Sequence, residues 1–280
     1  MRYSTIGLVA NPLRPEATQC ASSAEKTLRE KGCIVVYPHE SKSDAENTVF
    51  PQPECIITFG GDGTLLIGAR IAMKYQIPLL GINLGTVGFL TEEQPEHLAQ
   101  TLDRLLRGDF AEEERSLLQV TNLQTCDSWT ALNDAVITRG GYARLIRMET
   151  QVNGQSYGTF TADGLIAATP TGSTGYSLSA GGPIVEPQMD CMILTPVCAH
   201  SLAQRPCIVS GRSVIDICLQ PDRSQTAELQ IDGLNRGSLK DGDRVRIALC
   251  SERFRLIRMH PYDFFGLVRT KLNEWGSIHA

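Results

Sequence analysis

The first 115 residues alternate between short apolar runs and longer stretches with a helical pattern. The run Thr5–Ala10 is typical of a strand, and Asn11-Pro12 directly after it marks a turn. The expected elements are strands at 5–10, 33–37, 54–59 and 79–83, and helices at 16–31, 64–75 and 95–108. This alternation predicts a parallel sheet covered by helices, a Rossmann-like α/β domain over residues 1–115.

The pattern changes after Arg115 to short β-branched or alternating runs, separated by Gly, Pro, Asn and Asp. Strands are expected at 117–122, 130–138, 145–152, 164–168, 192–196, 208–210, 214–219, 227–231 and 244–249. Their length and spacing predict a mostly-β sandwich domain over residues 116–260. The tail, 261–280, becomes helical again with Phe264 and Leu267 on one side, so we expect this helix to return to the first domain.

The composition is that of a globular protein, with 280 residues of which 42% are hydrophobic and 20% charged. A formal net charge of −5 disfavours nucleic acid as a partner, so polyphosphate would have to be bound locally by backbone N–H groups, a metal and a few cations. Nine cysteines without a C-x-x-C pair indicate buried reduced thiols. Because no apolar run reaches the ~18 residues of a membrane span, we expect a cytosolic protein with no membrane partner.

The segment Gly60-Gly61-Asp62-Gly63-Thr64 lies where a predicted strand meets a predicted helix, the place where α/β proteins bind ligands. Its glycines let the backbone approach a phosphate closely, and the helix N-terminus offers free N–H donors. Asp62 would repel phosphate unless it has a separate task. Two tasks fit, accepting a proton from an attacking hydroxyl or holding Mg²⁺, and the alternative is a tight turn in which Asp62 caps the helix.

Two more segments can contribute to the same site. Gly81–Phe89 brings three further glycines to what should be the end of a neighbouring strand. In Leu132–Ile137, Asn133 and Asp134 interrupt a strand-like run. Alone this pair would be a turn or bulge, but beside the other segments it can bind ribose hydroxyls or a base edge.

The segment Thr161–Pro183 is the most unusual part of the chain. A strand at 164–168 is followed by residues that are nearly all small or hydroxylic, together with Tyr176. Such a stretch makes a poor core but a good ligand wall, because it supplies N–H and OH groups and an aromatic face. A flexible linker is the alternative, although a linker would not carry Asp163 and Tyr176 between core-like strands.

These segments, in this order and together with Leu194–Pro206, resemble the NAD kinase family over roughly residues 5–270. The Gly60–Thr64 turn is also similar to that of diacylglycerol kinases, sphingosine kinases and 6-phosphofructokinases, whereas Thr161–Pro183 is highly specific. The resemblance implies a first domain like that of phosphofructokinase and diacylglycerol kinase. It implies ATP-dependent phosphorylation of the 2′-hydroxyl of the adenosine ribose of NAD, giving NADP, with a divalent metal such as Mg²⁺. It also implies a homodimer or homotetramer with sites near subunit contacts.

The same resemblance implies roles for individual residues. Asp62 matches the family's proton acceptor, and with Gly63 it would meet the ribose. Asn133 and Asp134 match a pair expected to bind NAD through adenine and ribose. The other residues that match dinucleotide-binding positions are Arg144, Thr161, Asp163, Thr174, Gly175, Tyr176, Ser177, Leu178 and Ser179. Three positions depart from the family's usual residues, Gly175 for Ala, Ala199 for Pro and Leu234 for Gln, and none of them is Asp62.

Two other interpretations belong to different classes of protein. A lipid or sugar kinase could share the Gly60–Thr64 turn, but the polar loop at 171–181 argues against an acyl pocket. A catalytically silent NAD sensor could retain the fold, but intact Asp62, Asn133 and Asp134 argue against it. Inorganic polyphosphate stands as an alternative phosphoryl donor, and NADH as an alternative acceptor.

Overall fold

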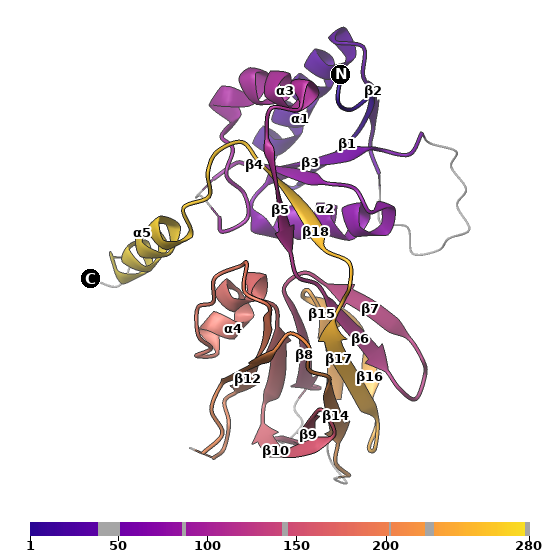
Figure 1. Cartoon of the computed structure of the whole chain (residues 1–280), viewed down its shortest axis with the longest axis vertical. Coiled ribbons are helices and arrows are strands. Elements are labelled where there is room, and N and C mark those ends of the chain that lie inside the picture. Colours follow the sequence, from indigo (N-terminus) through magenta and orange to yellow (C-terminus); the bar gives the residue numbers. More distant parts are fainter. Residues whose placement is uncertain (39–50, 86–87, 142–144, 202, 222–226, 278–280) are drawn as a thin grey trace. The chain divides into compact units, whose positions relative to one another are not determined.

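A computed structural model describes residues 1–38, 51–85, 88–141, 145–201, 203–221 and 227–277 (Figure 1). The chain divides into two compact units: the first combines Met1–Glu114 with the chain from Phe254 onward, and the second is Arg115–Arg253. Within the described residues, each helix is too short or too polar to cross a lipid bilayer.

The first unit is built on one six-stranded sheet. Its strands are β1 (Thr5–Ala10), β2 (Ile34–Val36), β3 (Cys55–Gly60), β4 (Leu79–Asn83), β5 (Ala111–Arg115) and β18 (Phe254–Arg258). They are arranged in the order β2-β1-β3-β4-β18-β5, and the pairs from β2 to β18 are parallel. The carboxyl ends of β3 and β4 therefore meet at one edge of the sheet, where Gly60 pairs with Asn83.

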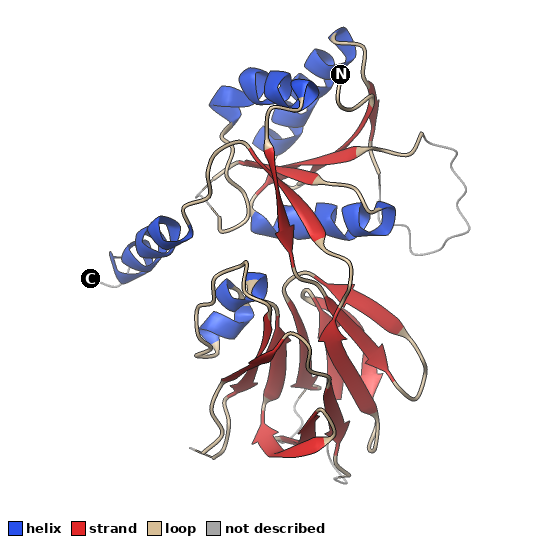
Figure 2. Ribbon diagram, in the orientation of Figure 1, coloured by secondary structure: helices blue, strands red, loops and turns tan. Residues whose placement is uncertain are grey.

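Helices cover both faces of this sheet (Figure 2). The helical elements of this unit are α1 (Pro15–Glu30), α2 (Asp62–Tyr75), η1 (Pro95–His97), α3 (Leu98–Arg107) and α5 (Phe264–Ser277), of which α1, α2 and α3 cover the sheet. Helices α1 and α3 pack together on one face, over Ile57, Phe59 and Leu80, and all three side chains are almost completely buried. Helix α2 lies against the opposite face. Successive residues of a strand point to opposite sides, so the strands present side chains to the helices on both faces.

The second unit contains two antiparallel six-stranded sheets. Its strands are β6 (Leu118–Asn122), β7 (Ser128–Ala131), β8 (Asp134–Arg139), β9 (Ile146–Val152), β10 (Gln155–Ala162), β11 (Gly164–Ala168), β12 (Cys191–Val197), β13 (Cys207–Ser210), β14 (Ile215–Leu219), β15 (Ala227–Ile231), β16 (Leu234–Leu239) and β17 (Arg244–Leu249). One sheet has the order β10-β9-β14-β17-β6-β7 and the other β13-β12-β11-β8-β15-β16. Apolar side chains from both sheets form one shared core, so this unit is a sandwich.

The second of these sheets also buries its outer face. Ile166 and Ala168 of β11 pack there with Val136, Val185 and Ile193. The segment after β11 forms the short helices η2 (Thr171–Thr174) and α4 (Tyr176–Ser179), whose neighbour Ala180 packs against the same cluster. Strand β11 is therefore buried on both faces, which fixes the position of the hydroxyl-rich segment that follows it.

The predicted architecture, an α/β domain, a mostly-β sandwich and a C-terminal helix, is confirmed. Four strands were not predicted from the sequence, namely β5, β10, β16 and β18. Strands β10 and β16 lie at sheet edges with mostly exposed polar side chains, so they show no apolar run. The expected strand at 130–138 is interrupted at residues 132–133, between β7 and β8.

The predicted boundary at residue 260 differs from the observed division, because β18 joins the sheet of the first unit. The sequence FRLIR places two arginines in a strand of this mixed sheet, which hides the strand pattern. The structure pairs both with acids of β5: Arg255 lies 3.1 Å from Glu112 and Arg258 lies 2.7 Å from Glu113. Helix α5, at the end of the chain, is grouped with the first unit.

Candidate active site

Asp62 is the first residue of α2, directly after the turn that ends β3. The N-cap position is occupied by Gly61, and no side chain caps the helix by a hydrogen bond. Asp62 therefore does not serve as the helix cap that the sequence left as an alternative. Its carboxylate instead turns to the loop that follows the neighbouring strand, β4.

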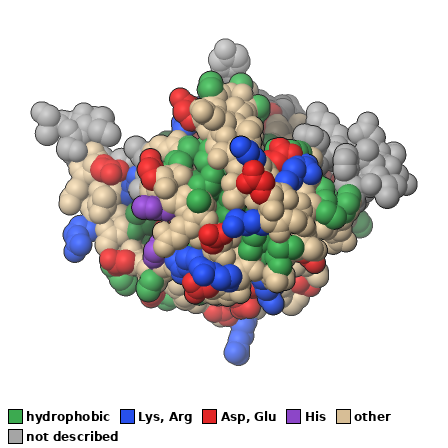
Figure 3. Space-filling view, turned by 90° about the horizontal axis from the view of Figure 1, so that it is seen from above, with side chains coloured by type: hydrophobic (Ala, Val, Ile, Leu, Met, Phe, Trp, Pro, Cys, Tyr) green, Lys and Arg blue, Asp and Glu red, His purple; other side chains and the backbone are tan. Residues whose placement is uncertain are grey.

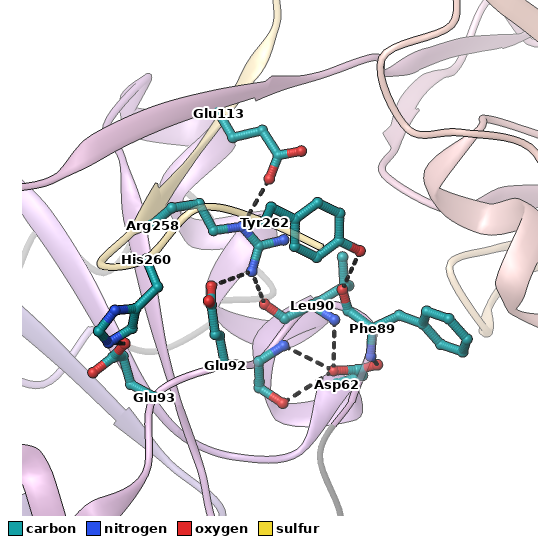
Figure 4. Close-up of polar contacts among 10 residues, drawn as sticks. Asp62, Phe89, Leu90, Glu92, Glu93, Glu113, Arg258, His260 and Tyr262 are labelled. Atoms are coloured by element: carbon teal, nitrogen blue, oxygen red, sulfur yellow. Dashed lines mark hydrogen bonds and ion pairs between the residues drawn. The ribbon is translucent and has the colours of Figure 1, made fainter. Parts of the chain in front are cut away.

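Four donors of that loop hold the Asp62 carboxylate (Figure 4). Oδ2 accepts a hydrogen bond from the backbone N–H of Phe89 at 2.8 Å. Oδ1 accepts three, each at 3.2 Å, from the backbone N–H groups of Leu90 and Thr91 and from the Thr91 hydroxyl. Each carboxylate oxygen has about two lone-pair acceptor sites. The three longer contacts share those of Oδ1, whereas Oδ2 has one donor and keeps capacity for one more partner.

The loop approaches Asp62 so closely that only glycine fits at position 88. A Cβ atom built on Gly88 would lie 2.0 Å from Oδ1 of Asp62 and 2.6 Å from Oδ2. No real Cβ atom tolerates such contacts, so a larger residue would displace the carboxylate. The two glycine-rich segments that the sequence placed at neighbouring strand ends thus meet where Gly88 contacts Asp62.

Acidic and basic side chains surround the other side of this loop. Arg258, which is only 4% exposed, contacts Glu113, Glu92 and the ring of Tyr262. Burial raises the pKa of the Glu92 carboxyl, and the nearby Arg258 charge partly offsets this. A cavity of about 230 Å³ lies beside the loop and is lined in part by Phe89, Arg258 and Tyr262.

In the second unit, Asp232 fixes the turn that carries Asn133 and Asp134. The Asp232 carboxylate accepts hydrogen bonds from three successive backbone N–H groups, those of Leu132 at 2.8 Å, Asn133 at 2.8 Å and Asp134 at 3.1 Å. The Asp232 backbone N–H in turn donates to the carbonyl of Asp134 at 3.0 Å. These contacts fix the backbone of the turn from which the Asn133 and Asp134 side chains extend.

Asp134 is a buried acid, with 6% of its surface exposed. Burial, and to a smaller extent the charge of Asp232, raises the pKa of its carboxyl from 3.8 to about 7. Asn133 has a buried side-chain oxygen without a hydrogen-bond partner among the described residues. A buried polar atom of this kind calls for a partner that a ligand can supply.

The hydroxyl-rich segment packs directly on this turn. The backbone N–H of Thr169 donates to the carbonyl of Asn133 at 2.9 Å, and its hydroxyl donates to the carbonyl of Leu132 at 2.6 Å. A Cβ atom on Gly172 would lie 2.1 Å from the same Asn133 carbonyl, so glycine is needed there. One on Gly175 would lie 3.7 Å from the Asn133 amide nitrogen, which places this loop residue beside Asn133.

The predicted NAD-binding residues of this loop, 174–179, differ in how exposed they are to a ligand. Tyr176 is 45% exposed, whereas Ser177 is fully buried with its hydroxyl 2.8 Å from that of Thr195. Thr174 and Leu178 are partly exposed, and Ser179 is exposed. The Tyr176 ring is therefore available to a ligand, and Ser177 stabilises the loop.

Thr161 and Asp163 lie at the opposite end of β11 from Asn133 and Asp134. In the antiparallel pairing Ala168 is opposite Asp134, while Gly164, next to Asp163, is opposite Thr138. The Asp163 carboxylate pairs with Arg139 at 2.7 Å, and the Thr161 carbonyl accepts from the backbone N–H of His200 at 2.9 Å. The structure thus separates the predicted dinucleotide-binding residues of this unit into two groups. Arg144 lies outside the described residues.

Sequence reasoning missed the residues that hold the others in place: Thr91, Asp232, Arg258 and Tyr262. Asp232 carried a signal, because it stands alone between a strand and Gly233, the pattern of a turn acid. It also has a left-handed φ of 46°, which is uncommon for a residue other than glycine. The other three carried none: Thr91 belongs to the loop that binds Asp62, Arg258 and Tyr262 bind that loop, and the sequence does not reveal its conformation.

The electrostatic setting agrees with local binding of a charged ligand. Acidic and basic side chains are interspersed on the face shown in Figure 3. Attraction of a polyphosphate must therefore come from the glycine turn and the α2 N-terminus, which offers backbone N–H donors and a favourable dipole. A carboxylate held beside such an anion site is what transfer of a phosphoryl group to a hydroxyl requires. The fold and the site define a kinase.

Comparison with known proteins narrows this class to one family. Family models for the ATP-NAD kinase N-terminal domain and the ATP-NAD kinase C-terminal domain match residues 6–110 and 132–259. The NAD kinase of Geotalea daltonii is 44% identical over 97% of this chain and 99% of its own length, and that of Moorella thermoacetica is 41% identical over 97% and 90%. The chain belongs to the NAD kinase family.

Two solved structures share the fold. The crystal structure of yeast NADH kinase complexed with NADH has a TM-score of 0.85 at 25% identity, over 96% of this chain and 87% of that one. The crystal structure of an NAD kinase from Archaeoglobus fulgidus in complex with ATP has a TM-score of 0.73 at 25% identity, over 96% and 98%.

The first prediction concerns the close approach of Gly88 to Asp62. Gly88→Ala should reduce kcat by at least tenfold, because its Cβ displaces the carboxylate from the loop amides. The control variant Gly32→Ala, which follows α1 outside the candidate site and whose Cβ meets no described atom within 4 Å, should keep clearly more of the rate. Steady-state kinetics measures both, and equal rates for the two variants would contradict the proposed contact.

The second prediction concerns Asp134. Because its folded-state pKa of about 7 lies above the ordinary 3.8, the folded protein binds this proton more tightly than the unfolded chain does. Its contribution to stability is present below about pH 4 and is lost as pH rises through about 7. Asp134→Asn removes this dependence. Relative to wild type, the variant's free energy of unfolding should therefore increase between pH 5 and 8, on the order of 1–3 kcal/mol.

Urea unfolding at several pH values measures this difference. Asp127→Asn, at an exposed acid just before β7, is the control and should follow wild type. Parallel pH curves for wild type and Asp134→Asn would show that Asp134 does not hold the extra proton.

Proposed function

We propose that Asp62 accepts the proton of the 2′-hydroxyl of the adenosine ribose of NAD while that oxygen attacks the γ-phosphorus of ATP. The chain is an enzyme of the NAD kinase reaction, in which NAD and ATP give NADP. The observation that carries the proposal is the Asp62 carboxylate, held by a second loop at the N-terminus of α2 with capacity left on Oδ2. A hydroxyl can reach Oδ2 without displacing the loop.

The same arrangement explains how a negatively charged carboxylate and a bound phosphate can share one turn. Four donors already stabilise the negative charge of Asp62, so it does not occupy the N–H groups at the start of α2. The first N–H groups of a helix have no partner within the helix and can bind phosphate oxygens. General-base catalysis contributes about 10²- to 10⁴-fold, so orientation and charge stabilisation must supply the rest of the rate.

We further propose that Asn133, Asp134 and Tyr176 bind the NAD adenosine. Asn133 offers an unpartnered buried oxygen, and Asp134 can donate its proton in the neutral form or accept in the charged form. The exposed ring of Tyr176 offers a face for a base, on a loop that Thr169 and Gly172 fix against Asn133. Gly63, exposed in the first turn of α2, lets the ribose approach Asp62.

A divalent metal, Mg²⁺, belongs to the proposed reaction. The described residues contain no cluster of three His, Cys, Asp or Glu side chains that could form a protein-only metal site. Mg²⁺ in phosphotransferases is commonly bound by few protein carboxylates together with substrate phosphates, and the remaining acceptor position of Asp62 is assigned here to the substrate hydroxyl. We propose that ATP phosphates supply most of its ligands. When bound, the metal neutralises charge on the transferring phosphoryl group.

The residues Thr161 and Asp163 are proposed to serve a site in a second copy of the chain. They precede β11, whereas Asn133 and Asp134 lie beside its end, and a strand of 5 residues spans about 17 Å. The chain would then act as a homodimer or homotetramer that shares its sites between subunits. The cytosolic location expected from the sequence also stays a prediction, and nine free thiols suit a reducing compartment.

The third prediction tests the base. Asp62→Asn keeps the size of the side chain but cannot accept the proton, so kcat should fall by about 10²- to 10⁴-fold while NAD still binds. Turnover is measured by coupling NADP formation to an NADP-specific dehydrogenase, and NAD binding by calorimetry. A variant that keeps more than about a tenth of the wild-type rate would exclude Asp62 as the base. Polyphosphate and NADH, used in place of ATP and NAD, test the alternative substrates in the same assay.

The fourth prediction tests the shared site by subunit complementation. Asp62→Asn and Asp163→Asn, carrying different affinity tags, are co-expressed and the mixed oligomers are purified through both tags. A mixed dimer contains one site with both native aspartates, so at low NAD it should recover about half of the wild-type activity per dimer. Activity no higher than the mean of the two separate variants would show that Asp163 acts in the same chain as Asp62, or in no site.

A further inference from the structure

Two side chains near the C-terminus bind the loop that holds Asp62. The Tyr262 hydroxyl donates to the backbone carbonyl of Phe89 at 3.1 Å. The Arg258 guanidinium, through Nη1, donates to the backbone carbonyl of Leu90 at 3.1 Å. Figure 4 shows both contacts on the side of the loop that faces away from the Asp62 carboxylate.

These carbonyls belong to the same peptide groups whose N–H groups hold Asp62. The carbonyl of Phe89 and the N–H of Leu90 form one peptide group, and that N–H donates to Oδ1 of Asp62 at 3.2 Å. The carbonyl of Leu90 and the N–H of Thr91 form the next, and that N–H donates to the same oxygen at 3.2 Å. Each peptide group thus links a C-terminal donor to the carboxylate, and a donor at its carbonyl strengthens the N–H as a donor.

Arg258 is held firmly enough to act in this way. Its Nε lies 2.7 Å from Glu113, its Nη1 lies 3.3 Å from Glu92, and its guanidinium carbon lies 4.1 Å from the centre of the Tyr262 ring. The side chain is 4% exposed, so water screens these interactions little. Glu113 comes from β5 and Arg258 from β18, so the contact ties the loop to the sheet.

We propose that Arg258 and Tyr262 are positioning residues for Asp62: through two peptide groups they hold Oδ1, so that Oδ2, which accepts only from the Phe89 N–H, is turned to meet the substrate hydroxyl. This inference rests on the proposed role of Asp62 as the base. It assigns the C-terminal segment a task in catalysis without contact with either substrate. It also explains why a strand of the first sheet is supplied from the far end of the chain.

Tyr262→Phe is the sharpest test, because it removes one hydroxyl, keeps the ring over Arg258 and changes no charge. Loss of one hydrogen bond that orients the base should lower kcat about 3- to 10-fold, with the KM values for NAD and ATP within twofold of wild type. Tyr37→Phe is the matched control in the same unit. It removes a hydroxyl that donates to Glu25 on α1 at 2.6 Å, and should leave kcat unchanged.

Arg258→Lys is the second variant, since it keeps a positive charge beside Glu92 and Glu113 but loses the fork that reaches two partners. It should lower kcat more than Tyr262→Phe does, again at nearly constant KM. Thermal unfolding identifies a variant that fails to fold. Rates are compared only between variants that unfold within a few degrees of wild type.

A double-mutant cycle with Asp62→Asn separates this inference from the role of Asp62 itself. If Asp62 is the base and Tyr262 acts through it, Tyr262→Phe should change the residual rate of Asp62→Asn less than twofold. A wild-type kcat for Tyr262→Phe, or the same loss in both backgrounds, would overturn the positioning role while Asp62 remains the base. A fully active Asp62→Asn would overturn both.

Discussion

The arrangement of the first unit depends on one contact, between the Asp62 carboxylate and the backbone N–H groups of Phe89, Leu90 and Thr91. It joins the loops that follow two neighbouring parallel strands, β3 and β4. Glycine at position 88 is a consequence, because any side chain there would occupy the position of the carboxylate. Because the loop amides bind the Asp62 carboxylate, the acid lies at the N-terminus of α2 without occupying the N–H groups of the helix.

The second unit contains the same kind of interaction, a carboxylate that binds successive backbone N–H groups. The Asp232 carboxylate binds three successive backbone N–H groups, at residues 132–134, as Asp62 binds those at 89–91. A carboxylate that accepts several amide hydrogen bonds shapes a turn more firmly than apolar packing does, because each bond is directional. In one unit the acid that shapes the turn is also the proposed base, whereas in the other it is a support for Asn133 and Asp134.

Much of this fold could be predicted from the sequence, because strands such as β1, β4 and β11 are mostly apolar runs and β15 alternates apolar and polar residues. Strands β10 and β16 could not, since edge strands with exposed polar side chains lack that pattern. Strand β18 was not predicted, because its two arginines interrupt the apolar pattern and their acidic partners on β5 are known only from the folded sheet.

The site too was only partly predictable from the sequence. Its glycines and acids were visible as local motifs, and Asp62 was singled out from them. The donors that hold Asp62 were not visible, since backbone N–H groups carry no sequence signal. Nor could spacing along the chain reveal that Thr161 and Asp163 lie at the far end of β11 from Asn133, because that follows from strand pairing.

The central claim, that the loop holds Asp62 so that Oδ2 receives the 2′-hydroxyl, is tested most directly by a crystal structure. The wild-type enzyme would be crystallised with NAD and a non-transferable ATP analogue. We predict a 2′-oxygen about 2.6–3.2 Å from Oδ2 of Asp62, with the bonds from Leu90 and Thr91 to Oδ1 intact. A 2′-oxygen within reach of another acid or base, with Asp62 more than about 4 Å away, would contradict it.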